Sequence, residues 1–232
     1  AGPGLGLALA KKFGQNGYNA ALIARNPDTL DTLVNDLSSH GINVARFVAD
    51  TSDQAALTAA LTAARTHFGS IDVLEFSPHS GGPGSMTSPT DVTAENLRPV
   101  LETLLLGAVT AVQTVLPGMV DAGHGTILFT AGSGSINPVP FFGTLNTAQA
   151  ATRNWALNLH NQLAGSGVYV AHIAIGVSIG DATPAEGYPF KTPDEIAAAF
   201  WDLHQERSTA ELTTPVRAPS RAMELAPGLL VC

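Results

Sequence analysis

Three glycines near the start of the chain are the residues most suited to holding a ligand. Residues 1–6 read AGPGLG and lead directly into an apolar pattern of helical period. Glycine lets the backbone bend with positive φ and approach a ligand closely, and the first turn of a helix offers unpaired N–H groups with a partial positive charge. This stretch therefore predicts a pyrophosphate-binding turn. A plain glycine turn before a helix is the alternative.

The elements that would position this turn alternate along the first part of the chain. Strands are predicted at residues 19–24, 44–49 and 72–76. Three helices are predicted between them. The first spans 4–15, and the second begins at the Asn26-Pro27 cap and ends at Gly41. The third begins at the capping-box spacing of 51–54 and ends at Phe68. A loop rich in Gly, Ser and Pro follows at 79–91.

The second part continues the alternation with longer helices. Helices are predicted at 94–119 and 143–163, and strands at 126–130 and 168–174. A polar turn occupies 131–135, and residues 175–190 are irregular. Thr192 and Glu195 have the spacing of a capping box, so a last helix begins there. Beyond Glu206 no element is predicted, and residues 207–232 are expected to form an irregular tail.

Strands that alternate with helices at this spacing indicate βαβ units. The expected fold is a single α/β domain over residues 1–206, with a Rossmann-like doubly wound parallel sheet in three α/β/α layers. A dinucleotide-binding turn follows a buried strand, whereas this chain starts inside the turn. We therefore expect the first strand to be missing from the N-terminus. The alternative is that the apolar run Leu229 to Val231 takes its place.

Composition excludes several classes of protein. The 232 residues carry a formal net charge of −8, which argues against a nucleic-acid partner because such partners need a basic face. Cys232 is the one cysteine, so an intramolecular disulfide and a cysteine metal cluster are excluded. No run reaches the roughly 20 apolar residues of a membrane span. We expect a cytoplasmic protein with no membrane partner, and no His, Asp and Glu spacing indicates a metal site.

From Ala1 to about Trp201, the order of parts resembles the short-chain dehydrogenase/reductase family. Gly4, Leu5 and Gly6 match the end of the glycine motif of that family, and Asp50 matches the aspartate that faces the adenine. The resemblance implies a nicotinamide cofactor and a small-molecule substrate. The residues that it assigns to cofactor binding are Gly2, Gly4, Leu5, Gly6, Arg25, Asp50, Thr51 and Ser77.

Arg25, which follows the strand expected at 19–24, decides which nicotinamide cofactor we expect. An acidic residue near this point would hold the ribose hydroxyls of NAD, whereas an arginine favours the extra phosphate of NADP. Ala24 and Arg25 leave no acid at the strand end. NADP is therefore the expected cofactor, and a surface arginine at a helix entry is the alternative.

The catalytic positions depart from the pattern of the family, which uses a tyrosine and a lysine four residues later on one helix face. Alignment places Leu145 at the tyrosine and Gln149 at the lysine. The lysine lowers the tyrosine pKa in the family, so its absence removes the usual acid. No lysine lies four residues after Tyr18, Tyr169 or Tyr188 anywhere in the chain.

Ser133, Asn146 and Gln149 project, by the resemblance, toward the place where chemistry occurs in the family. They could hydrogen-bond a substrate carbonyl, although they are neutral and cannot act as ordinary acids near pH 7. The alternative is a polar turn with two capping or solvent-facing amides. Tyr188 and Lys191 lie in the variable segment that covers the substrate in relatives, where a surface loop is the alternative.

These observations lead to one expected function and two alternatives. The expected function is an atypical NADP(H)-dependent oxidoreductase that acts on a small carbonyl or enone-like substrate. One alternative is a non-catalytic nucleotide-sensing or partner-binding protein with the same fold, and the other is a non-redox cyclase or isomerase. In relatives the two long helices pair between subunits, so the resemblance also implies a homodimer or homotetramer.

Overall fold

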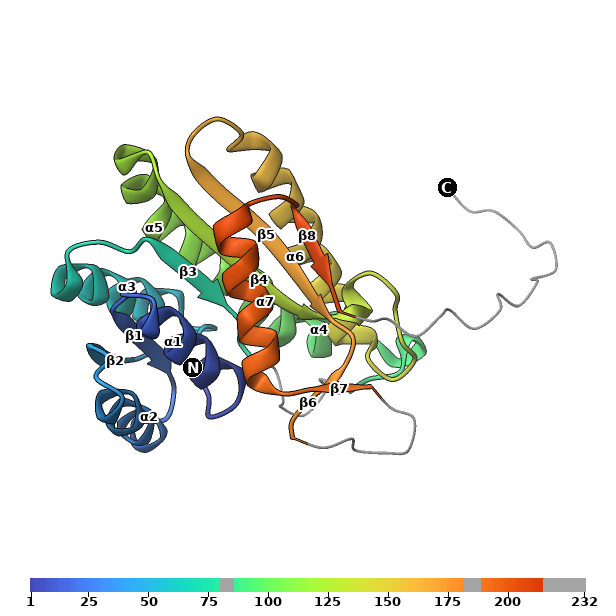
Figure 1. The fold of residues 1–232 in the computed structure, drawn as a ribbon. Helices are drawn as coiled ribbons and strands as arrows, with labels where there is room; N and C mark the ends of the chain where they lie inside the picture. Colours follow the sequence, from blue (N-terminus) through green and yellow to red (C-terminus); the bar gives the residue numbers. More distant parts are fainter. Residues whose placement is uncertain (80–85, 182–188, 215–232) are drawn as a thin grey trace.

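The computed structural model describes residues 1–79, 86–181 and 189–214, in which helices and parallel strands alternate (Figure 1). The α-helices are α1 (Leu5–Gln15), α2 (Pro27–Ser39), α3 (Gln54–Phe68), α4 (Ala94–Leu101), α5 (Gly107–Ala122), α6 (Gly143–Gln162) and α7 (Pro193–Glu206). The strands are β1 (Ala20–Ala24), β2 (Val44–Val48), β3 (Val73–Phe76), β4 (Gly125–Gly132), β5 (Val168–Ile175), β6 (Ser178–Ile179), β7 (Phe190–Lys191) and β8 (Glu211–Thr213).

The predicted helix starts are formed by side chains that accept hydrogen bonds from the first turn. The Asn26 side chain accepts from the backbone N–H groups of Asp28 and Thr29 at the start of α2. Thr192 and Glu195 form the reciprocal capping box of α7, as predicted. The capping box expected at 51–54 is wrong. Asp53 caps α3 instead, because its carboxylate accepts from the backbone N–H of Ala56.

The long helix predicted at 94–119 is continuous, with a π-helical turn, Glu102–Leu106, between α4 and α5. Residues Ala94–Ala122 are long and apolar enough to cross a membrane by length and composition alone. In this structure the same helix packs against the sheet, with Ala108, Val112 and Met119 buried in the core. One side of this helix is therefore buried against the sheet.

All the strands that pair do so in parallel, which confirms the expected fold class. One sheet has the order β3-β4-β5-β8, and a second sheet pairs β1 with β2. Leu74 on β3 lies opposite Ile127 on β4, and Ile127 lies opposite Val170 on β5. Within the described residues no pairing joins β1 to β3, so the main sheet is divided into two parts at this point.

Helices cover both faces of the sheet and complete the three layers. In Figure 1, α1 and α7 lie side by side on one face, where Leu9 and Phe200 pack against Leu128 of β4. On the other face α3, α5 and α6 enclose a second core cluster that includes Leu61, Val112 and Ala156. The central strands of the sheet are apolar on both faces because helices cover both faces of the sheet.

The expectation of an irregular tail after Glu206 is wrong for its first part. Residues Glu211–Thr213 form β8, which pairs in parallel with β5 so that Glu211 lies opposite His172. A three-residue strand at the edge of a sheet has too few residues for a visible alternation, which is why the pattern did not show it. The run Leu229 to Val231 lies outside the described residues.

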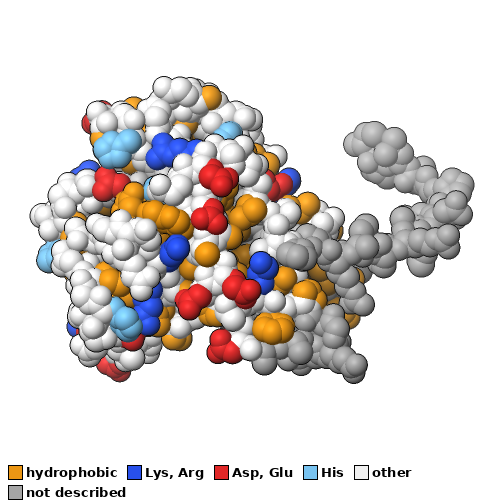
Figure 2. Space-filling model, viewed as in Figure 1, with side chains coloured by type: hydrophobic (Ala, Val, Ile, Leu, Met, Phe, Trp, Pro, Cys, Tyr) orange, Lys and Arg blue, Asp and Glu red, His pale blue; other side chains and the backbone are white. Residues whose placement is uncertain are grey.

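The surface seen in Figure 2 is the face that carries α1 and α7. Acidic side chains are scattered over it, with Lys and Arg side chains between them and uncharged surface around both. On this face the acidic side chains are therefore interspersed with basic ones.

Candidate functional site

A cleft of about 860 Å³ opens where the parallel strands end and the following loops begin. This is where open α/β sheets bind their ligands. Its walls come from the segments that follow β1, β2, β3, β4 and β5. The residues expected to bind the cofactor that line it are Gly2, Leu5, Gly6, Arg25, Asp50, Thr51 and Ser77.

The glycine segment forms one wall and enters α1 directly. Gly4 is the N-cap of α1, and no side chain caps this helix start in the described chain. A Cβ on Gly6 would lie 3.3 Å from the Cα of Ala1, so the turn is tight at this glycine. The helix therefore presents its first backbone N–H groups beside the cleft, which suits an anionic ligand.

Arg25 and Asp50 form a charged pair on the rim of the cleft. One Arg25 nitrogen lies 3.8 Å from Oδ2 of Asp50, and the Arg25 side chain is 72% exposed. Asp50 also accepts hydrogen bonds from the backbone N–H and the hydroxyl of Ser52. These hydrogen bonds, the backbone one foremost, hold the pKa of Asp50 below its ordinary value.

Thr51 is held in the cleft by a close approach from the long helix. A Cβ on Gly107 would lie 2.6 Å from the backbone oxygen of Thr51 and 3.3 Å from the ring of Phe76. Only glycine fits this point of the helix without displacing the loop after β2. The start of α5 therefore supports the wall of the cleft that Asp50 and Thr51 form.

Glu75 is a carboxylic acid on β3 at the floor of the cleft, and the sequence interpretation missed it. Thr130 Oγ1 donates to Glu75 Oε1 at 2.7 Å, and Ser77 Oγ donates to Oε2 at 2.9 Å. Burial of the carboxyl group raises the pKa of Glu75, and the two hydrogen bonds oppose that shift. A single acid inside the otherwise apolar strand Val73–Phe76 was the signal that could have identified it.

Leu145 and Gln149, which align with the tyrosine and lysine of the family, lie in different surroundings. Gln149 lines the cleft, where its side-chain oxygen would lie 3.3 Å from a Cβ on Gly132. Leu145 packs against a buried cluster that includes Val100 and Leu104. Leu145 is therefore a partly buried apolar side chain, and Gln149 presents a neutral amide to the cleft.

Ser133 and Asn146 do not join Gln149 on the cleft wall. Asn146 is buried, and its side-chain N–H donates to the backbone oxygen of Val139 at 2.9 Å. A Cβ on Gly134 would lie 2.0 Å from Oδ1 of Asn146, so this amide packs tightly against the turn that contains Ser133. Asn146 thus holds the loop after β4 rather than facing a ligand.

A comparison with protein families matches most of the chain, including the glycine segment at residues 1–6. The model of the short chain dehydrogenase family matches residues 1–185. The chain belongs to this family. The family membership expected from the order of parts is therefore confirmed.

Relatives of this short-chain dehydrogenase include NADP(H)-dependent proteins. The NADP-dependent 3-hydroxy acid dehydrogenase of Salmonella typhi is 25% identical over 213 residues, which cover 92% of this chain and 83% of that protein. The structure of L-sorbose reductase from Gluconobacter frateurii with NADPH and L-sorbose has a TM-score of 0.81 at 24% identity, over 91% of this chain and 90% of that one. NADP(H) in these relatives is the cofactor that Arg25 predicts.

A third solved structure is similar in fold. The NADPH-bound short-chain oxidoreductase of Pseudomonas aeruginosa PAO1, which contains an atypical catalytic center, has a TM-score of 0.80 at 19% identity, over 94% of each chain. This likeness concerns the fold alone. The present chain spans 48% of the length of one curated relative and 83% of the length of others.

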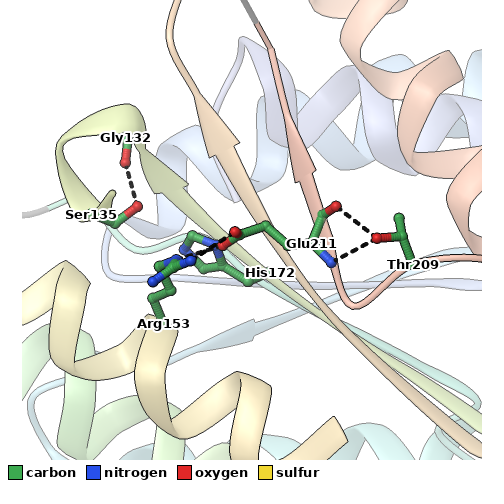
Figure 3. A network of polar contacts seen from close by, with 6 residues as sticks. All are labelled: Gly132, Ser135, Arg153, His172, Thr209 and Glu211. Carbon is green, nitrogen blue, oxygen red and sulfur yellow. Dashed lines mark hydrogen bonds and ion pairs between the residues drawn. The ribbon is translucent and has the colours of Figure 1, made fainter. Parts of the chain in front are cut away.

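A polar network joins β5, β8 and α6, and Figure 3 shows it together with the turn after β4. Arg153 binds both carboxylate oxygens of Glu211, at 2.5 and 2.8 Å, and His172 contacts the same carboxylate. Ser135, in the turn after β4, donates to the backbone oxygen of Gly132 at 2.8 Å. These contacts position strands and turns rather than a ligand.

The other residues with titratable side chains in the predicted loops are dispersed. His79 is exposed and lines the cleft three residues after the end of β3. Lys191 lies on β7, opposite Ile179 of β6. Tyr188 lies outside the described residues. His79 is the one member of this group that the structure brings to the cleft.

Proposed function

We propose that this short-chain dehydrogenase is an atypical NADP(H)-dependent oxidoreductase. The observation that carries the proposal is the Arg25–Asp50 pair on the rim of the same cleft as the uncapped start of α1. An arginine at this strand end suits a phosphate on the ribose, and the helix start suits a pyrophosphate. The residues present therefore fit NADP better than NAD.

The roles of the binding residues follow from their places in the cleft. Gly2, Gly4, Leu5 and Gly6 bring backbone N–H groups to the pyrophosphate. Arg25 binds the additional phosphate, and Asp50 and Thr51 form the wall for the adenine. The Ser77 hydroxyl donates to Glu75, and Ser77 also lines the cleft.

The cofactor supplies a hydride when bound, and the protein supplies no proton donor at the two positions that the family uses for acid catalysis. Leu145 and Gln149 stand at the positions of the family's tyrosine and lysine, so general acid catalysis worth roughly 10²–10⁴-fold is lost there. Gln149 can donate a hydrogen bond to a carbonyl oxygen through its amide. We therefore propose a small carbonyl or enone-like substrate whose reduction requires little protonation by the protein.

Two other functions share the same cleft. A nucleotide-sensing or partner-binding protein is favoured by Leu145, because an apolar side chain that packs against Val100 and Leu104 offers no reacting group at this position. A non-redox cyclase or isomerase would use the cleft without a cofactor. Binding of NADPH without turnover identifies the first, and turnover without cofactor identifies the second.

The test is a titration with NADPH and NADH, followed by nicotinamide fluorescence and by thermal shift. We expect NADPH to bind at least tenfold more tightly than NADH, and Arg25→Ala to remove this preference. Arg65→Ala, an exposed arginine on α3, is the matched control and should leave the preference unchanged. Equal binding of both nucleotides by the wild type would contradict the role of Arg25, and absence of binding would contradict the oxidoreductase.

We also propose that two or four copies of the chain assemble through the helices α5 and α6. Leu106 and Val120, at the ends of α5, are large apolar side chains that are more than 40% exposed. Sedimentation of the wild type and of Leu106→Glu tests this proposal. A monomeric wild type would contradict it.

A further inference from the structure

Glu75 is an acid of the cleft to which the proposed function gives no role of its own. It stands on β3, one residue before the strand ends, and its side chain is partly exposed. It lines both the cleft and an adjoining cavity of about 430 Å³. A cofactor that fills the cleft therefore lies beside a group that can be either neutral or negatively charged.

The contacts of Glu75 place it toward the end of the cleft that holds Gln149. Thr130 donates to Glu75 Oε1, and it lies two residues before Gly132 on β4. A Cβ on Gly132 would lie 3.3 Å from the side-chain oxygen of Gln149. Arg25 follows β1, which belongs to the other part of the sheet. The carboxyl group is thus nearer to the position of the family's lysine than to the end of the cleft at Arg25.

The charged and titratable groups around Glu75 come from several elements. Those that line the cleft and the adjoining cavity are the Ala1 amino group and the side chains of Tyr18, Arg25, Asp50, Asp72 and His79. The described residues of α1 and α7 contribute no charged side chain to either lining, and β4 contributes the uncharged Thr130.

Most of these groups have partners of their own. Arg25 pairs with Asp50, Asp72 pairs with His124, and the Tyr18 hydroxyl lies 3.0 Å from His204. The Ala1 amino group acts on Glu75 electrostatically, but its effect is smaller than that of burial. His79 is the remaining titratable side chain, so it must be distinguished from Glu75 by experiment.

The surroundings of Glu75 can hold both of its protonation states. Burial raises the pKa of Glu75 above its ordinary value of 4.5, and the hydrogen bonds from Thr130 and Ser77 oppose that shift. A hydroxyl group can donate to a carboxylate, and after rotation it can accept from a carboxylic acid. Neither state leaves the carboxyl group without a hydrogen-bond partner, so a nearby charge can decide between them.

The two redox states of the cofactor differ in charge at one place. The nicotinamide ring is neutral in NADPH and positively charged in NADP⁺, whereas the phosphates carry the same charge in both. A carboxylate attracts the charged ring and repels the phosphates, and a neutral carboxylic acid does neither. Ionised Glu75 therefore disfavours NADPH more than it disfavours NADP⁺.

We propose that Glu75 makes the cleft distinguish the reduced cofactor from the oxidised one: the neutral acid accompanies NADPH, and the carboxylate accompanies NADP⁺. This inference rests on the proposed cofactor function. Its consequence is that the preference for NADPH over NADP⁺ weakens as pH rises and Glu75 ionises. In the same way, exchange of bound NADPH for NADP⁺ releases a proton from Glu75.

The experiment measures Kd for NADPH and for NADP⁺ at several values between pH 5 and pH 8. In the wild type, the ratio of the NADPH Kd to the NADP⁺ Kd should rise by at least about tenfold with pH, the order expected for one charge in a partly buried site. In Glu75→Gln the ratio should stay constant within about twofold. Glu95→Gln, in the exposed first turn of α4, is the matched control and should behave as the wild type.

A second measurement observes the carboxyl group directly and does not depend on a variant that folds. The protein is labelled with ¹³C at the glutamate carboxyl carbons, and its carboxyl resonances are titrated with acid in the presence of each nucleotide. The resonance of Glu75 should titrate at a pH about one unit higher with NADPH than with NADP⁺, which matches a tenfold change in the ratio of Kd values. Titration of all carboxyl resonances at the same pH with both nucleotides would overturn the proposal.

The outcomes separate the role of Glu75 from the cofactor function. If both nucleotides bind with the same pH dependence, Glu75 does not sense the ring, so the inference is overturned and the proposed cofactor function is retained. If the ratio still changes in Glu75→Gln but becomes constant in His79→Gln, the effect belongs to His79, which also overturns the inference. If neither nucleotide binds at any pH, the inference and the proposed function are both overturned.

Discussion

The Nδ1 atom of His172 lies 2.9 Å from Oε1 of Glu211, directly across the pairing between β5 and β8. Arg153 of α6 binds both oxygens of the same carboxylate. One carboxylate thus connects an edge strand, its neighbouring strand and the helix that covers them (Figure 3). The hydrogen bond from Arg153 is the largest cause that lowers the pKa of Glu211.

Glu211→Gln should destabilise the protein, because the amide cannot accept from Arg153 with both of its heavy atoms. We expect a loss of about 2 kcal/mol in the free energy of unfolding, since hydrogen bonds to charged groups are worth about 1.5–3 kcal/mol. Denaturant unfolding measures it. Glu206→Gln, at the exposed end of α7, is the control, and an equal loss in both variants would refute a special role for Glu211.

Acid should destabilise the fold through His172 before most carboxylates titrate. Burial lowers the pKa of His172 below its ordinary value of 6.5, which outweighs the opposing effect of Glu211. The folded state therefore favours neutral imidazole, so stability is complete above pH 6.5 and is lost as pH falls through the lowered value. His172 Nε2 is buried without a hydrogen-bond partner in the described structure, so a proton there would find no acceptor.

The measurement is the urea midpoint of the wild type and of His172→Gln between pH 8 and pH 5. We expect the wild-type midpoint to fall over this range and the variant to show a smaller fall. Burial also lowers the pKa of His204, so the variant should retain part of the pH dependence. An identical slope in the two proteins would show that His172 does not carry the effect.

Gly107→Ala should disturb the cleft from the helix that supports it. The added methyl group would meet the backbone oxygen of Thr51 at 2.6 Å, and such overpacking costs about 1–3 kcal/mol. NADPH binding should weaken as well, because the loop after β2 must move. Gly118→Ala is the matched control on the same helix: nothing lies within 4 Å, and the variant should gain up to about 1 kcal/mol.

Asn146→Ala and Gln149→Ala should separate a structural amide from a ligand-facing one. Asn146 loses its hydrogen bond to Val139, so we expect a loss of about 1–2 kcal/mol in stability. Gln149→Ala should change stability by less than about 0.5 kcal/mol, and should lower turnover or substrate affinity instead. Thermal unfolding and steady-state kinetics on both variants decide this. Loss of activity only in Asn146→Ala would reverse the assignment.

Local chemistry in the sequence was sufficient to predict most elements and several of the residues that line one cleft. Asn26, Thr192 and Glu195 cap their helices through short contacts that a pattern reveals. Residues near β1 and β2 reach one cleft because parallel strands end at the same edge of a sheet. For this reason Arg25 and Asp50, 25 residues apart, could be placed together from their positions at strand ends.

Features that depend on packing between distant elements could not be predicted in this way. β8 is short, and its pairing is with β5, a strand distant in the sequence. Asn146 was expected at the site because the helix that carries it was predicted, whereas the packing of the Gly134 turn against it was not. Glu75 was overlooked because it stands in an apolar strand, where charge is rare. Its partner Thr130, 55 residues away in the chain, reaches it only when β3 and β4 are paired.

The division of the sheet has a consequence for how the molecule opens in solution. β1, β2 and α2 are connected to the four-stranded sheet by side-chain packing and the chain itself, with no ladder across the gap in the described residues. Amide protons of Leu22 and Val44 should therefore exchange with solvent through a local opening that leaves β4 and β5 folded. We expect these two parts of the sheet to open as separate foldons, with the rim of the cleft at Arg25 and Asp50 in the less protected one.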